Sequence, residues 1–119
     1  MSFDWKEFLE LARVLQGSKG DSYSIEASDR SSVSRAYYAV FCSVRNYAEK
    51  QMDFRRTGKA EDHTRLVEHL RNTGRSQMAN QLRRLRRWRN RCDYEDSVAN
   101  LKALVENAIS VSDTTLSQL

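Results

Sequence analysis

The sequence predicts an all-α domain, built as an antiparallel, up-and-down bundle of four or five helices. The chain contains no proline and only four glycines, so few residues interrupt a helix. It is rich in Arg, Glu, Ala, Leu and Gln, which favour helix formation. Apolar residues recur every three or four positions, and 119 residues suffice for one core. A single helical domain over residues 1–119 is therefore expected.

The first helix is predicted over residues 4–16. Asp4 precedes Glu7 by three residues, the spacing of a capping box, in which two side chains satisfy free N–H groups at a helix start. The apolar stripe of this helix consists of Phe8, Leu11, Ala12 and Leu15. Gly17 is expected to end it, because glycine readily adopts the left-handed conformation found after helices. Residues 17–26 are polar and are predicted to form a loop.

The second helix is predicted to be the longest, from Ser28 or Asp29 to about Met52. Its apolar face is broad, which indicates contact with more than one neighbouring helix. This face consists of Val33, Ala36, Tyr37, Val40, Phe41, Val44, Tyr47 and Ala48. Adjacent helical residues point about 100° apart. One of Tyr37 and Tyr38 is therefore expected in the core, and the other at an interface or cleft edge.

Three further helices are predicted after a loop over 53–60. They are expected over residues 61–72, over residues 76–94, and from Asp96 or Ser97 onwards. Gly74 separates the first two of them. The apolar face of the last helix consists of Val98, Leu101, Leu104, Val105, Ala108 and Val111. Residues 112–119 are mostly polar, so this tail is expected to fray.

Several classes of protein and site are not expected. No apolar run approaches the roughly 18 residues that a membrane span requires. The first residues lack the apolar core of a signal peptide, so a cytoplasmic protein is expected. Cys42 and Cys92 have no Cys or His at metal-ligand spacing and are expected to be reduced, packed side chains. No metal and no cofactor are predicted.

The net charge of the chain is distributed unevenly. Residues 69–92 contain eight arginines and no acidic residue, a local charge of +8. Because the whole chain carries +4, the remaining residues carry −4. Such a basic segment on an otherwise acidic protein indicates a polyanionic ligand.

The arginines of the fourth helix point in different directions. A solvated face is predicted for Arg84, Arg87 and Arg91, opposite the apolar side of the helix. A groove beside the apolar side is predicted for Arg83, Arg86 and Asn90.

Arg89 is exceptional, because it lies on the apolar face, four residues after Leu85. An unpaired buried guanidinium is costly, and Asp93 lies one turn further on as a possible acceptor. Two interpretations are open. Arg89, Asn90 and Asp93 line a polar cleft or subunit interface, or they form a salt bridge that closes the end of the bundle.

Two segments resemble the HEPN family of helical nucleotide-binding domains. Residues 34–41, Ser-Arg-Ala-Tyr-Tyr-Ala-Val-Phe, are similar to a Ser-Arg-x-Tyr-Tyr-x-x-Phe segment of small bacterial members. Residues 89–94, Arg-Asn-Arg-Cys-Asp-Tyr, are similar to the segment that ends the fourth helix in that family. The resemblance implies a HEPN-like antiparallel bundle, and usually a homodimer.

Many HEPN domains are metal-independent ribonucleases with an Arg, a polar residue and a His four to six residues after the Arg. The resemblance places Arg89 and Asn90 on the first two positions. Tyr94 stands where the His is common, and no His follows Asn72. With an unperturbed pKa near 10, tyrosine is a poor base at neutral pH. The other candidate base, Asp93, is weak unless burial raises its pKa.

Three readings of the function follow. The first is a ribonuclease of toxin or defence type, with a degenerate motif formed by Arg89, Asn90, Asp93 and Tyr94. The second is a non-catalytic, dimeric module that binds RNA, a nucleotide or a nucleotidyltransferase partner. Its binding residues would be Arg83 and Arg86, with His63 if that side chain reaches the cleft. The third is a helical dimer whose arginines only solubilise one face.

Overall fold

The computed structural model describes residues 2–119 and contains five α-helices and no strand among them. The helices are α1 (Glu7–Leu15), α2 (Ile25–Gln51), α3 (Asp62–Asn72), α4 (Ser76–Tyr94) and α5 (Leu101–Ser117). The all-α bundle predicted from composition and periodicity is confirmed. No helix in this part of the chain is both long and apolar enough to cross a membrane.

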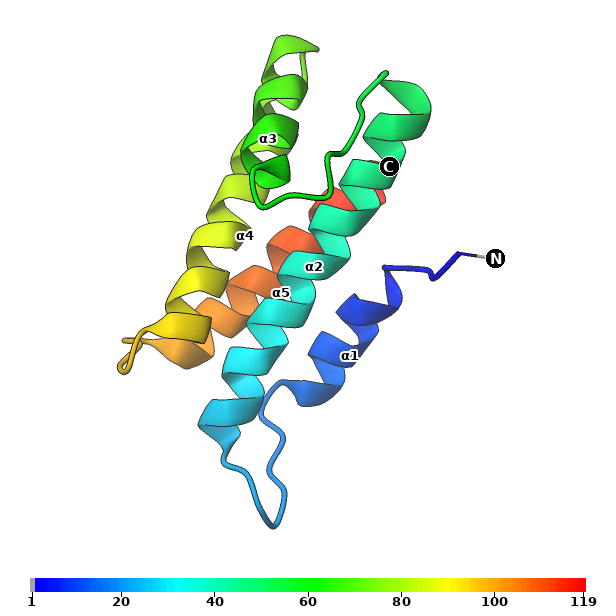
Figure 1. Cartoon of the computed structure of the whole chain (residues 1–119). Helices are drawn as coiled ribbons and strands as arrows, with labels where there is room; N and C mark the ends of the chain where they lie inside the picture. Colours follow the sequence, from blue (N-terminus) through cyan, green and yellow to red (C-terminus); the bar gives the residue numbers. More distant parts are fainter. Residues whose placement is uncertain (1) are drawn as a thin grey trace.

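The long helix α2 lies at the centre, packed against α1, α4 and α5, while α3 packs against α4 (Figure 1). Helices α1 and α4 run antiparallel to α2 (Figure 1). Helix direction does not simply alternate up and down along the chain, because the loop between α2 and α3 folds back along α2 before α3 begins. As a result α3 runs in the same direction as α2, with His63 beside Tyr37 and His69 beside Met52. The start of α3 therefore faces the middle of α2.

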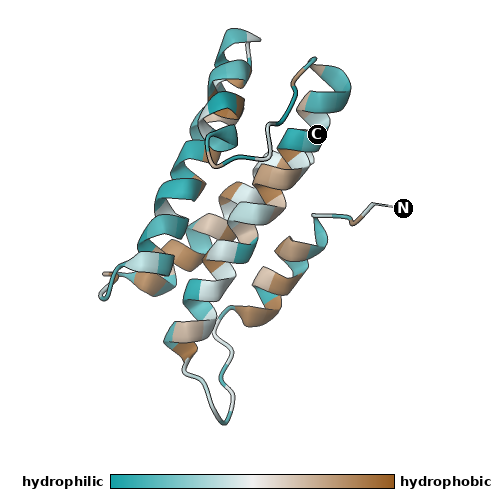
Figure 2. Ribbon diagram, viewed as in Figure 1, coloured by the Kyte–Doolittle hydropathy of each residue, from teal (hydrophilic) through white to brown (hydrophobic). Residues whose placement is uncertain are grey.

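The core is one cluster to which all five helices contribute buried apolar side chains. Its largest fully buried apolar side chains are Val33, Val40, Val44, Leu66, Leu70, Leu82, Leu85 and Val105. Each such side chain contributes roughly 1.5–3 kcal/mol through its removal from water. Hydrophilic residues cover the visible faces of α3 and α4, whereas hydrophobic residues, including Val14, remain exposed along α1 (Figure 2).

The predicted starts of the first two helices were wrong. Helix α1 begins at Glu7 without a capping box, because the Asp4 carboxylate accepts the backbone N–H of Lys6 instead. Helix α2 begins at Ile25, where the Ser24 hydroxyl accepts the backbone N–H of Ala27. Asp29 lies inside α2 and accepts the backbone N–H of Gly17, so it ties the preceding loop to the helix rather than capping it.

The start of the last helix was also predicted wrongly, whereas the bounds of α4 were correct to the residue. Helix α5 begins only at Leu101. In the preceding segment the Arg30 guanidinium donates to the carbonyl oxygens of Cys92, Glu95 and Asp96, at 3.0, 2.6 and 3.1 Å. Those carbonyls are satisfied by a side chain, so the end of α4 is held on α2 and the chain continues as a loop.

The C-terminal tail does not fray where that was expected, at residue 112. Helix α5 continues to Ser117, and Ser112, Thr115 and Leu116 are buried. The Ser112 hydroxyl donates to the carbonyl oxygen of Ala36, 3.3 Å away on α2. Small polar side chains are tolerated here because backbone carbonyls satisfy their hydroxyls. Both cysteines are buried and unpaired, as predicted.

Candidate functional site

Two adjoining depressions lie beside α4. The first, here called the arginine groove, has a volume of about 450 Å³ between α3 and α4. Its charged and polar lining includes Arg71, Arg83, Arg86, Arg87 and Asn90. The second, here called the aromatic pocket, has a volume of about 390 Å³ between α2, the α2–α3 loop and α4. Its lining includes Tyr37, Tyr38, Phe41, Arg45 and Arg89. His63 and Arg86 line both, so the two depressions meet at these residues.

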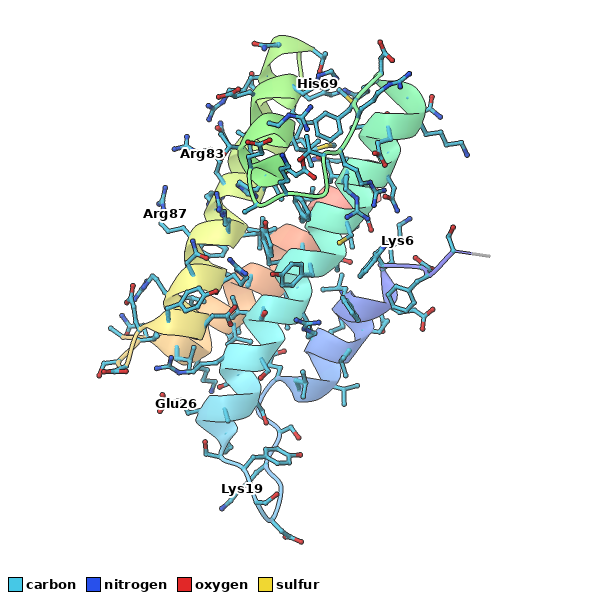
Figure 3. All side chains as sticks on the ribbon, viewed as in Figure 1. Lys6, Lys19, Glu26, His69, Arg83 and Arg87 are labelled. Atoms are coloured by element: carbon cyan, nitrogen blue, oxygen red, sulfur yellow. The ribbon has the colours of Figure 1, made fainter. Side chains whose placement is uncertain are left out.

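The arginine groove is strongly basic. Residues three and four apart share a helix face, which brings Arg83, Arg86, Arg87 and Asn90 to the side of α4 that faces α3. Arg83 and Arg87 project from the same side of α4 into solvent (Figure 3). Within residues 2–119, neither of them forms an ion pair, and Glu68 is the one acid in the lining.

Arg89 is held at the wall of the aromatic pocket. One guanidinium nitrogen donates to the Tyr38 hydroxyl at 2.8 Å, and the other terminal nitrogen donates to Oδ1 of Asn90 at 2.6 Å. Asp93 is further away, at 3.8 Å, and its side chain is more exposed than that of Arg89. The guanidinium carbon also lies 5.2 Å from the centre of the Tyr37 ring. Tyr38 and Asn90 fix Arg89 more directly than the predicted ion pair with Asp93 does.

His63 forms a buried, uncharged pair with Tyr37. Nδ1 of His63 lies 2.9 Å from the Tyr37 hydroxyl, and the two residues are 6% and 4% exposed. Burial, with the positive charges of Arg86, Arg89 and Arg83, lowers the pKa of His63 to about 3. Burial also raises the pKa of the Tyr37 hydroxyl. Both side chains are therefore neutral at pH 7.

Asp62 fixes the loop that brings His63 into the site. Its carboxylate accepts the backbone N–H groups of Thr57 and Gly58, the Thr57 hydroxyl and the guanidinium of Arg65. Burial alone would raise the pKa of Asp62, but these hydrogen bonds outweigh it and hold the pKa below its usual range. A carboxylate that anchors two backbone amides pins the loop next to the start of α3.

The structure brings most of the predicted site residues together. Arg83, Arg86, Asn90 and His63 line the arginine groove, and Arg89 lies in the adjoining pocket. Asp93 is at the edge of this cluster, 3.8 Å from the Arg89 guanidinium. Tyr94, predicted to stand in for the histidine beside Arg89, is 75% exposed and lines neither depression, and its ring centre lies 6.0 Å from the Arg89 guanidinium carbon. One of the two adjacent tyrosines was predicted in the core and the other at an interface or cleft edge, and the structure assigns the two places: Tyr37 is buried, whereas Tyr38 is half-buried at the cleft edge.

Sequence reasoning missed part of the aromatic pocket. Arg45 and Phe41 line it together with Tyr38, at spacings of three and four on one face of α2. Extending the helical face of Tyr38 along the sequence would have found them. Arg56 comes from the loop and is paired with Glu49 at 2.6 Å, and no sequence pattern indicated its place.

No three His, Cys, Asp or Glu side chains in residues 2–119 are grouped to hold a metal ion. Comparison of the chain with family models, with curated proteins and with solved structures gave no match.

Proposed function

We propose that this chain binds the phosphate backbone of RNA through the arginine groove. The observation that carries the proposal is the groove itself, in which Arg71, Arg83, Arg86 and Arg87 lie along a concave surface with Glu68 as the one acidic neighbour. Guanidinium groups match phosphate oxygens in geometry and charge. The HEPN resemblance of residues 34–41 and 89–94 supports RNA as the polyanion.

Binding is better supported than cleavage. Metal-independent cleavage of RNA needs a base whose pKa lies near the working pH to take the 2′-hydroxyl proton. Burial and neighbouring arginines lower the pKa of His63 to about 3, and Tyr94 is exposed outside the groove. Ribonuclease activity remains a second candidate, because His63, Arg86 and Asn90 line one groove and bound phosphate would offset the arginine charges.

The test is the salt dependence of RNA binding. Fluorescence anisotropy of a labelled, unstructured RNA 20-mer, measured from 50 to 300 mM KCl, should show affinity that falls steeply with salt as counterions are released. For single strands the slope of log K against log salt changes by about 0.7 per phosphate contact, so R83Q/R87Q should reduce it by about 1.4. Arg84→Gln is the matched control, because Arg84 is exposed on α4 and lies outside the groove.

Four results would count against the proposal or redirect it. Absence of RNA binding at 50 mM KCl would refute it, as would an equal loss of slope in Arg84→Gln. Release of shortened RNA in the presence of EDTA, lost in Arg89→Ala, would favour the ribonuclease candidate. Salt-insensitive association with a nucleotidyltransferase would favour the protein-partner reading. Sedimentation of the same samples tests the proposed homodimer.

A further inference from the structure

The two depressions differ in chemistry although they share a wall. The arginine groove contains no aromatic ring except the imidazole of His63, whereas Tyr37, Tyr38 and Phe41 line the aromatic pocket. A uniform polyanion such as a phosphate chain would need only the first kind of surface. The second kind is suited to a flat, unsaturated ring.

The rings of the aromatic pocket form an ordered wall. The Tyr37 and Phe41 planes differ by 13°, with centres 5.8 Å apart, and the Phe41 and His63 planes differ by 23°, with centres 6.0 Å apart. Within this wall Tyr37 and His63 are buried, while Phe41 is half-buried and is the most exposed of the three rings to the pocket.

Guanidinium groups border the same space. The Arg45 guanidinium carbon lies 5.8 Å from the centre of the Phe41 ring, and Arg86 and Arg89 line the pocket on the α4 side. Bases of single-stranded nucleic acids stack on aromatic rings and on arginine planes, and the adjacent phosphates meet basic side chains. The volume of about 390 Å³ lies within the range of small-ligand pockets.

We propose that the aromatic pocket receives one unpaired base of a bound RNA, stacked against Phe41, while the neighbouring phosphates lie in the arginine groove. The strand crosses from one depression to the other at Arg86, which lines both. This inference rests on the proposed function and names its substrate class as single-stranded RNA. A base inside a duplex would first have to unpair and unstack, at a cost of a few kcal/mol.

The inference is tested with three polyanionic probes: a single-stranded RNA 12-mer, the corresponding duplex and inorganic polyphosphate. The parent protein should bind the single strand at least tenfold more tightly than the duplex. Phe41→Leu, which keeps an apolar side chain but removes the ring, should weaken single-strand binding by about 5- to 100-fold. Polyphosphate has no base, so its affinity should not change in this variant.

Phe8→Leu is the matched control, because Phe8 is also half-buried but lies outside both depressions. It should leave all three affinities unchanged. Equal binding of duplex and single strand, or an equal effect of Phe41→Leu on polyphosphate and RNA, would overturn the inference and leave the proposed function standing. Failure of all three probes to bind would instead refute the proposed function.

A second measurement covers the case in which Phe41→Leu does not fold. A 12-mer that carries 2-aminopurine at successive positions is titrated with the parent protein. At one position the fluorescence should change on saturation, because the base leaves its neighbours and stacks in the pocket. Unchanged fluorescence at every position would overturn the inference.

Discussion

Replacing His63 by glutamine tests the electrostatics of the site directly. In the folded chain His63 is buried, bonded to Tyr37, and faces Arg83, Arg86 and Arg89, so its pKa is lowered from 6.5 to about 3. In the unfolded chain the same imidazole is solvated and takes up a proton below about pH 6.5. Glutamine keeps a neutral polar side chain that can still meet the Tyr37 hydroxyl, but it does not titrate.

The sign of the effect follows from which state binds more protons. Between pH 6.5 and pH 3 the unfolded chain binds a proton that the folded chain does not, so the free energy of unfolding falls as the pH falls. One pKa unit corresponds to about 1.4 kcal/mol. The titration of His63 should therefore lower the free energy of unfolding by about 2–3 kcal/mol between pH 7 and pH 4.5. That is a large part of the roughly 5–15 kcal/mol by which small domains are stable.

Urea denaturation followed by circular dichroism, at pH 7, 6, 5 and 4.5, provides the measurement. The parent should lose stability faster than His63→Gln as the pH falls. Carboxylates titrate in both proteins, so their contribution cancels in the difference between the two free energies of unfolding. Tyr37→Phe should keep the parent's pH dependence, because burial is the main cause of the lowered pKa. A parent-minus-variant difference that stays constant over this range would show that His63 is not held neutral.

Two further predictions concern the segments that position the site. Arg30→Ala should lower the free energy of unfolding by about 2–3 kcal/mol, because the carbonyls of Cys92, Glu95 and Asp96 lose a charged donor. Arg30→Lys should recover only part of this in urea denaturation, and full stability of the alanine variant would contradict the role of Arg30. Asp62→Ala should speed hydrogen exchange at the Thr57 and Gly58 amides at least tenfold, measured by mass spectrometry or NMR, whereas unchanged exchange would argue against the carboxylate anchor.

Helical periodicity in the sequence was enough to predict on which side of a helix many of the side chains lie. Counting about 100° per residue correctly placed Arg83 and Arg86 beside a groove and Arg84 outside it. The same count assigned Arg87 to the solvated face, and this was wrong, because Arg87 lines the arginine groove. The same count predicted that only one of Tyr37 and Tyr38 lies in the core, and the structure shows that it is Tyr37. These results depend on one helix at a time, for which sequence order and spatial order are directly related.

Local sequence patterns predicted the helix ends less reliably, because the hydrogen-bond partners that a residue finds in the folded chain determine where a helix begins. Asp4 and Glu7 had the spacing of a capping box, but Asp4 instead bonds to Lys6. The start of α5 was also misplaced: the residues where it was expected form a loop, in which Arg30, more than 60 residues earlier, donates to the carbonyl oxygens of Glu95 and Asp96. Nothing near residue 96 in the sequence reveals that contact.

The sequence by itself determined the helical class, the bounds of α4 and the faces on which most of its arginines lie, because these follow from local propensity and from the fixed helical turn. Only the tertiary structure decided which side chains share a pocket. His63 joins Arg86 because the α2–α3 loop folds back and Asp62 anchors it, and Phe41 and Arg45 meet Arg89 across two packed helices. Such contacts depend on how elements pack over long separations, which the periodicity of a single segment does not encode.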